Sequence, residues 1–339
     1  MRAVAAGITD VGLQRDHNED SFAILKEHAL YIVADGMGGH RAGDVASRLA
    51  TEAIVDFFRA TAAEDFTWPF HFDSRLSEEE NRLLTGIKIA NRQIIERSAR
   101  SRECHGMGTT IVGALFNEKA GKMYIGHVGD SRCYRLREGR LELLTQDHTL
   151  LNDVLELKPD IDADSAARLP RNVITNALGM DKNVRVSVRT YEIAAGDRYV
   201  LCSDGLTDEV DDGQIAQALA VGGTVDDQVQ LLIDLAAEGG GARDNIAVVV
   251  LSCSVSPGIG KLPQRPVPPR RAYPEDVDAQ VLLEMEIDGE DESVEVTVVT
   301  DPDDDDAPEL EIMEAKPASN VGKKRRRPDE TVVLGKDRE

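Results

Sequence analysis

The sequence predicts an α/β domain followed by a long acidic tail, and three observations support this prediction. Residues 1–254 alternate short β-like runs with amphipathic stretches of helical period. Several of the β-like runs end in turns that contain aspartate and glycine, which is typical of strand ends. Beyond residue 254, proline and acidic residues replace apolar ones. We therefore expect the core in residues 1–254 and a disordered, Pro-rich and acidic tail over residues 255–339.

Strands are expected at residues 29–34, 125–128 and 198–202, each followed by an aspartate in a turn with glycine. Residues 121–140 predict two strands and a hairpin that turns at Glu138 and Gly139. The apolar run 246–251 fits a final buried strand. Carboxylates at strand ends are held by the scaffold and face solvent, so these ends are candidate functional positions.

Helices are expected at residues 43–61 and 78–99, where apolar residues recur at spacings of three and four. Two shorter helices at 211–220 and 225–237 precede the final strand. Residues 147–170 also have a helical pattern, which a proline interrupts, and they connect two of the predicted strand regions.

Composition excludes several functional classes. The formal net charge of −23 and the sequence pI of about 4.7 argue against binding to nucleic acid or anionic lipid. The four cysteines form no C-x-x-C pair, so neither a zinc knuckle nor a redox motif is expected. No secretory signal and no run of about 18 apolar residues is present. We therefore expect a cytoplasmic protein without membrane insertion.

Five short acidic motifs carry the candidate chemistry. An isolated Asp-Gly pair is usually only a turn, but five such motifs share one chemical character. Hard divalent ions such as Mn²⁺ and Mg²⁺ prefer oxygen ligands, and the scarcity of spaced histidine and cysteine pairs disfavours zinc. The motifs are Arg15-Asp-His-Asn-Glu19-Asp20, Asp35-Gly36-Met37-Gly38-Gly39-His40, Gly129-Asp130-Ser131-Arg132, Ser203-Asp204-Gly205 and Arg243-Asp244-Asn245.

With these motifs in this order, residues 1–254 resemble the type 2C, or PPM, protein phosphatases of the bacterial kind. The match includes the segment 106–110 and the region from Asp147 to Gly179. The resemblance implies a four-layer α-β-β-α sandwich of two mainly antiparallel sheets flanked by helices, with metals at one edge. It also implies metal-dependent hydrolysis of phosphoserine and phosphothreonine on proteins, including kinases, and an activity that opposes bacterial serine/threonine kinases in signalling.

The same resemblance implies a set of metal ligands. Asp35 would bridge two Mn²⁺ or Mg²⁺ ions, and Gly36 would offer its carbonyl oxygen to the second ion. Asp204 and Asp244 would hold the first ion. Two such ions can lower the pKa of a shared water and neutralise charge on phosphoryl oxygens, after which hydroxide attacks in line.

The remaining predicted site residues surround these ligands. Glu19 and Asp20 would orient ligands of the second ion, directly or through waters. Asp130 resembles the family's ligand to a third, looser ion. Arg15 would grip two phosphate oxygens; the alternative is a surface arginine paired with a nearby carboxylate.

The proton donor to the leaving group is less clearly encoded. Animal members of the family carry a histidine directly after the Asp-Gly pair, whereas Met37 stands there in this chain. His40 is the nearest substitute and is the predicted general acid. The alternative is that His40 has a purely structural role and that water supplies the proton.

Two other functions compete with the protein phosphatase. The first is hydrolysis of small phosphorylated molecules, and the second is a non-catalytic signalling module that acts through its tail. In the tail, Thr331 is flanked by acidic residues and has Leu334 at position +3, which resembles the phosphothreonine peptides bound by forkhead-associated domains. Binding of such a domain to phosphorylated Thr331 is therefore a further hypothesis.

Overall fold

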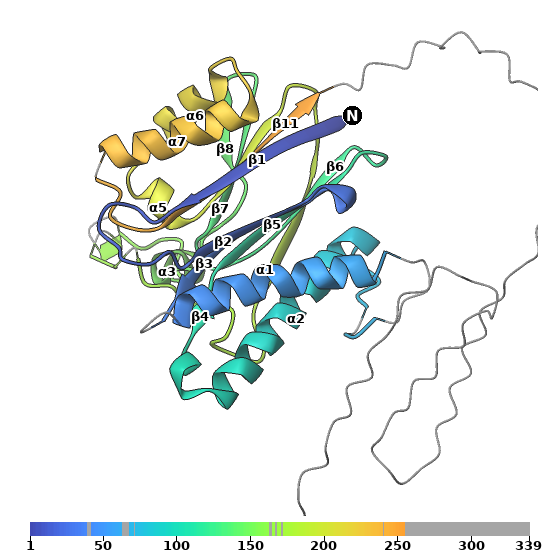
Figure 1. Ribbon diagram of the computed structural model, residues 1–339, viewed down its shortest axis with the longest axis vertical. Coiled ribbons are helices and arrows are strands. Elements are labelled where there is room, and N and C mark those ends of the chain that lie inside the picture. Colours follow the sequence, from blue (N-terminus) through green and yellow to red (C-terminus); the bar gives the residue numbers. More distant parts are fainter. Residues whose placement is uncertain are drawn as a thin grey trace, which may run out of the picture. The chain divides into compact units, whose positions relative to one another are not determined.

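Two antiparallel sheets lie face to face at the centre of the protein, with helices on both outer faces (Figure 1). The computed structural model describes residues 1–38, 42–62, 68–70, 72–162, 165–166, 168–170, 172–239 and 241–254. The first sheet has the order β1-β11-β10-β7-β8, and the second has the order β2-β3-β5-β6-β9 with β4 paired to β3. The predicted tail, including Thr331, lies outside the described residues.

The strands have the following bounds: β1 Arg2–Asp10, β2 Asp20–Leu25, β3 Leu30–Met37, β4 Gly108–Thr109, β5 Ile111–Asn117, β6 Lys122–Val128, β7 Arg132–Arg137, β8 Arg140–Leu143, β9 Ser187–Glu192, β10 Arg198–Cys202 and β11 Ile246–Ser254. The helices are α1 Ala42–Ala60, α2 Glu78–Arg100, α3 Leu150–Leu157, α5 Asp204–Thr207, α6 Asp212–Ala220 and α7 Val225–Gly239, with short 3-10 helices at Lys26–His28 and Arg102–Cys104.

The alternation of side chains along β3 explains the layering. Tyr31 and Val33 point into the core between the two sheets, whereas Leu30, Ile32 and Ala34 join the core beneath α1 and α2. Because both faces of the strand are covered, its sequence is a continuous apolar run rather than an alternating one.

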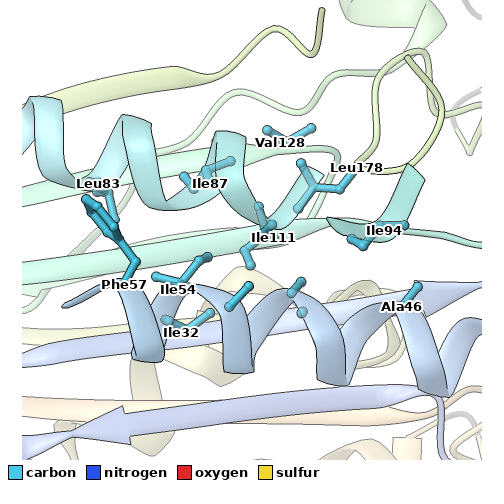
Figure 2. Packing of buried hydrophobic residues seen from close by; sticks show 14 of the residues in the cluster. Ile32, Ala46, Ile54, Phe57, Leu83, Ile87, Ile94, Ile111, Val128 and Leu178 are labelled. Carbon is cyan, nitrogen blue, oxygen red and sulfur yellow. The ribbon is translucent and has the colours of Figure 1, made fainter. Parts of the chain in front are cut away.

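Helices α1 and α2 cover the second sheet. Figure 2 shows Ile54 of α1 and Leu83 and Ile87 of α2 packed over Ile32 and Ile111 of the strands. Each such side chain stabilises the fold by roughly 1.5–3 kcal/mol when fully buried. The spacing of these apolar residues along both helices is what the sequence pattern predicted.

The start of α2 is fixed by its own residues. The hydroxyl of Ser77 accepts a hydrogen bond of 3.2 Å from the Glu80 N–H, and the Glu80 carboxylate accepts one of 2.8 Å from the Ser77 N–H. This reciprocal capping box satisfies two backbone donors that the first turn would leave unpaired. The helix therefore begins where its apolar face first meets the sheet.

Helices α6 and α7 cover the opposite face of the sandwich. Ile215 and Leu219 of α6 and Leu232 of α7 pack against Val200 of β10 and Val248 of β11. Helix, sheet, sheet and helix therefore form four layers, which confirms the predicted α-β-β-α sandwich. Of the described helices, none combines the length and the apolar character that a membrane span requires.

The predicted elements correspond closely to those observed. The predicted helices at 43–61 and 78–99 are α1 and α2 within one residue at each end, and those at 211–220 and 225–237 are α6 and α7. Within the described part of the stretch 147–170, Leu150–Leu157 forms helix α3. Strands β1, β2, β5 and β9 were not singled out: β1, β2 and β9 mix apolar residues with polar and charged ones, and glycine interrupts the apolar run of β5.

The fold brings the motif aspartates to one edge of the sandwich. Asp20 begins β2 and Asp35 lies near the end of β3, whereas Asp130 lies in the turn between β6 and β7. Asp204 follows the end of β10, and Asp244 precedes the start of β11. Since neighbouring strands are antiparallel, the end of one strand and the start of its partner lie at the same edge.

Candidate metal centre

Three aspartates from distant parts of the sequence are in direct contact. Asp20 and Asp35 face each other in the pairing of β2 with β3. The carboxyl group of Asp35 lies beside those of Asp20 and Asp204, close enough for the three groups to shift one another's pKa values. Asp20 is only 8% exposed, and its Oδ2 accepts a hydrogen bond of 2.6 Å from the hydroxyl of Ser203. The structure therefore brings together three of the predicted ligands.

Burial raises the pKa values of these carboxyl groups, because the charged form loses its solvation. Burial, together with repulsion from Asp204 and Asp244, raises the pKa of Asp20 to about 7. The pKa of Asp35 is raised well above its ordinary value by burial and then by the charges of Asp20 and Asp204. Burial also raises the pKa of Asp204. Carboxylates that repel one another in this way fit a hard divalent cation.

Asp130 adds a fourth carboxyl group to the same region. Burial, followed by the charge of Asp204, raises the pKa of Asp130 to about 7. The buried Oδ1 of Asp130 has no hydrogen-bond partner among the described residues. Buried polar atoms usually have a partner, so an unpartnered carboxylate oxygen beside other carboxylates also fits a cation ligand.

The carboxylates approach one another in pairs rather than converging on a point. Within the described parts of the chain, no three His, Cys, Asp or Glu side chains are drawn together tightly enough to enclose a cation. Repulsion between like charges favours such a spread arrangement. The fit to a metal therefore rests on the donor chemistry, the raised pKa values and the unpartnered Asp130 oxygen.

Glu19 and Gly36 lie against the start of α1. The N–H of Gly36 donates a hydrogen bond of 3.1 Å to the carbonyl oxygen of Glu19, and the Glu19 carboxylate accepts one from the backbone of Gly43. A Cβ on Gly36 would lie 2.2 Å from the carbonyl oxygen of Gly43. Only glycine allows this close approach of β3 to α1, which leaves the Gly36 backbone beside the carboxylates.

Arg15 and Asp244 form an ion pair at the exposed side of the cluster. The Arg15 Nη2 lies 2.6 Å from the Asp244 Oδ2, and about half of the Arg15 side chain is exposed. The expected alternative was a pair with a carboxylate close to Arg15 in sequence, but the partner lies 229 residues away. Exposed pairs of this kind are weak, so the guanidinium can exchange this carboxylate for a phosphate.

Asn245 was not predicted as a site residue, although it belongs to one of the motifs. Its Oδ1 accepts a hydrogen bond of 2.8 Å from the Glu19 N–H, and its Nδ2 donates to the carbonyl oxygens of Val11 and His17 at 2.8 and 2.9 Å. The side chain thus fixes the loop that carries Arg15 and Glu19 to the start of β11. The motif itself was the only sequence signal for this role.

Asp208 was also not predicted as a site residue. It lies one helical turn after Asp204 and donates its backbone N–H to the Asp204 carbonyl oxygen at 2.8 Å. Its pKa is raised by burial and, among smaller causes, by Asp244. The four-residue spacing from Asp204 could have revealed that both side chains share one side of the chain. The predicted general acid, His40, lies outside the described residues.

Comparison with known proteins gives the same class of protein. The family model for protein phosphatase 2C matches residues 14–232. The chain is 35% identical over 247 residues to the serine/threonine phosphatase stp of Listeria monocytogenes serotype 4b, covering 72% of this chain and 93% of that protein. It is 34% identical over 245 residues to the serine/threonine protein phosphatase PstP of Mycobacterium tuberculosis, covering 72% of this chain and 44% of PstP.

Comparison with solved structures gives the same class of protein. The crystal structure of the Mycobacterium tuberculosis phosphatase PstP superimposes with a TM-score of 0.63 at 34% identity, covering 75% of this chain and 99% of that one. The catalytic domain of PstP in complex with 2 manganese ions gives a TM-score of 0.61 at 33% identity, with the same coverage. Stp1 from Staphylococcus aureus gives 0.64 at 34% identity and covers 75% of this chain and 96% of that one.

An acidic centre at the edge of a four-layer sandwich defines a class of phosphate-ester hydrolases. The chain belongs to the protein phosphatase 2C family. This membership confirms the predicted PPM-type serine/threonine protein phosphatase of the bacterial kind. The roles of the individual site residues stay predictions.

Proposed function

We propose that this protein hydrolyses phosphoserine and phosphothreonine on proteins at the carboxylate cluster, with two divalent cations as cofactors. The observation that carries the proposal is the position of Asp35 beside both Asp20 and Asp204, where burial raises the pKa of all three carboxyl groups. Three carboxyl groups with raised pKa values lie here with no cationic side chain among the hydrogen-bond partners described above. A site of this kind favours a bound metal over an arginine or lysine partner.

Manganese is the preferred cofactor, since a family relative at 33% identity was crystallised with two manganese ions. Asp35, Gly36, Asp204 and Asp244 are the proposed ligands, supported by Glu19 and Asp20. Such ions supply Lewis-acid chemistry: they activate water and neutralise charge on phosphoryl oxygens. Magnesium has the same ligand preference, and Asp130 is the proposed ligand of a third ion.

The protein's own residues would bind and orient the phosphate. Arg15 lies at the exposed side of the cluster, where it can release Asp244 and donate two parallel hydrogen bonds to phosphate oxygens. Asn245 keeps the Arg15 loop in place through three hydrogen bonds. His40 remains the proposed proton donor to the leaving hydroxyl group.

The proposed biological role is to oppose bacterial serine/threonine kinases in the cytoplasm, with phosphorylated proteins, kinases among them, as substrates. Residues 1–254 are the proposed catalytic domain and residues 255–339 a separate tail. Recruitment of a forkhead-associated domain through phosphorylated Thr331 is a further proposal, which rests on the sequence around that threonine.

Phosphate release from a phosphothreonine peptide, a phosphotyrosine peptide and a small phosphate ester tests the activity. Each substrate is measured with Mn²⁺, with Mg²⁺ and after chelation. We expect fastest release from the phosphothreonine peptide with Mn²⁺ and none after chelation. Equal activity after chelation would refute the metal requirement, and activity on the small ester alone would favour the small-molecule phosphohydrolase.

A further inference from the structure

The turn that carries Asp130 is held in an unusual backbone conformation. Gly129, directly before Asp130, has a φ of +96°, and a Cβ on it would lie 2.6 Å from the Thr110 side chain. The next residue, Ser131, is fixed by a hydrogen bond of 2.6 Å between its hydroxyl and that of Thr110. Since the Asp130 Oδ1 has no partner of its own, the backbone of this turn decides where the carboxylate points.

His148 holds both backbone groups of Gly129. The Gly129 N–H donates to the His148 Nδ1 at 3.1 Å, and the His148 N–H donates to the Gly129 carbonyl oxygen at 3.0 Å. His148 is 5% exposed and stacks on His127 of β6, with 4.8 Å between ring centroids. One residue therefore fixes the peptide groups on both sides of Gly129, immediately before Asp130.

The same histidine is tied to the two ends of the segment that contains α3. The Asn176 Nδ2 lies 2.8 Å from the His148 Nδ1, and the Thr175 N–H donates to the His148 carbonyl oxygen at 2.9 Å. Thr149 and Ile174 form a β-bridge next to these contacts. His148 thus connects the Asp130 turn to the base of the segment 149–174.

The hydrogen bonds also define the state of the ring. A backbone N–H can only donate, so the His148 Nδ1 carries a lone pair and, in the neutral ring, Nε2 carries the proton. Nε2 lies 2.9 Å from the Ser187 hydroxyl. Burial, with repulsion from His127 and Arg185, lowers the pKa of His148 to about 4, so the ring is neutral at physiological pH. In this tautomer His148 donates to Ser187 and does not act as its base.

We propose that His148 is a positioning residue for the phosphatase reaction, which fixes the Gly129–Asp130 turn through its Nδ1 and so sets the cation affinity at Asp130. The proposal rests on the proposed function for its catalytic consequence. Its structural content, the dependence of the Asp130 turn on an acceptor at Nδ1, is independent of which substrate the protein hydrolyses. Supporting residues of this kind typically change metal affinity or activity by about 10-fold to 100-fold.

Two amide variants of the full chain test the roles of the His148 Nδ1 and Nε2 separately. His148→Asn places an amide oxygen near the position of Nδ1 and keeps an acceptor for Gly129, whereas His148→Gln reaches toward Nε2 and loses it. Ser187→Ala, the matched control, removes only the partner of Nε2. We expect His148→Gln to weaken the lowest-affinity Mn²⁺ site by about 10-fold or more, and His148→Asn and Ser187→Ala to stay within about threefold of the wild type.

Mn²⁺ binding is measured by titration calorimetry, and hydrolysis of a phosphothreonine peptide is measured as a function of Mn²⁺ concentration. Hydrogen exchange of the peptide that covers Gly129 gives a readout without metal, and we expect it to accelerate in His148→Gln but not in His148→Asn. Equal Mn²⁺ affinity and equal exchange in the two amide variants would overturn the proposal. If wild-type protein binds Mn²⁺ but hydrolyses no phosphopeptide, the proposed function fails, while calorimetry and exchange still decide the role of His148.

Discussion

Replacing Asp35 by asparagine should stabilise the metal-free protein while abolishing its activity. The carboxyl group of Asp35 lies beside those of Asp20 and Asp204. Two unit charges about 4 Å apart repel by about 4 kcal/mol at an effective dielectric constant of about 20. The charges of Asp20 and Asp204, after burial, raise the pKa of Asp35 well above its ordinary value, so removing the Asp35 charge should give a gain of about 2–4 kcal/mol at pH 8.

The sign of the pH dependence follows from the same carboxyl groups. A carboxyl group whose pKa is higher in the folded than in the unfolded protein binds more protons when folded, so stability falls as pH rises between the two values. For Asp20 this range runs from about 4 to about 7. In the metal-free wild type the unfolding temperature should therefore fall across this range, and Asp35→Asn should reduce the fall.

Thermal unfolding followed by circular dichroism tests both expectations. In a chelator at pH 8 we expect Asp35→Asn to raise the unfolding temperature by roughly 4–16 °C, with phosphopeptide hydrolysis in Mn²⁺ reduced more than about 100-fold. Asp56→Asn, which changes an exposed aspartate of α1, is the matched control and should change neither. A lower unfolding temperature for Asp35→Asn in chelator would refute the account of mutual repulsion.

Three further predictions concern an ion pair away from the site and two residues beside the carboxylates. Arg137→Ala leaves the buried Asp197 carboxylate without its ion pair of 2.6 Å and should lower the free energy of unfolding by about 3–5 kcal/mol with kcat/KM unchanged, as urea unfolding and kinetics would show. Although burial opposes it, Arg137 keeps the pKa of Asp197 below its ordinary value, so this loss should be full above about pH 4 and shrink as the pH falls further. Gly36→Ala should prevent native folding, because its Cβ would lie 2.2 Å from a backbone carbonyl oxygen, whereas Gly222→Ala, with nothing within 4 Å, should give a wild-type circular dichroism spectrum. Arg15→Lys removes bidentate donation to phosphate and should raise KM for a phosphothreonine peptide by about 10-fold without weakening Mn²⁺ binding; an unchanged KM would contradict the phosphate role.

The parts of the fold that could be predicted from the sequence depend on local chemistry. The apolar spacing of α1 and α2 is set by residues three and four apart, so their bounds were predicted within one residue. Asp35 and Asp204 stand next to glycine at strand ends, and turn chemistry alone indicated that they are held at an edge of the scaffold. The sandwich itself came from the family resemblance, because alternation of strands and helices is compatible with several α/β folds.

The contacts that the sequence could not predict join residues far apart in the chain. Asn245 accepts a hydrogen bond from the Glu19 backbone, 226 residues away, and Arg15 pairs with Asp244 rather than with a neighbour. His148 lies in the region from Asp147 to Gly179 that shares the family resemblance, and its hydrogen bonds to Gly129 depend on the packing of the turn after β6 against the segment after β8. No local pattern encodes such pairings, since they follow from the packing of the two sheets.

The position of the acidic centre also explains why the rest of the fold carries the stability. Buried carboxylates with raised pKa values oppose folding at neutral pH, and they lie at the strand ends rather than in the middle of the strands. The three hydrophobic cores fill the spaces between the four layers. The ion pair of Arg137 with the buried Asp197 lies at the opposite ends of β7 and β10. Because stabilising contacts and repelling charges occupy different ends of the same strands, the repulsion at the edge can be retained for cation binding without loss of the fold.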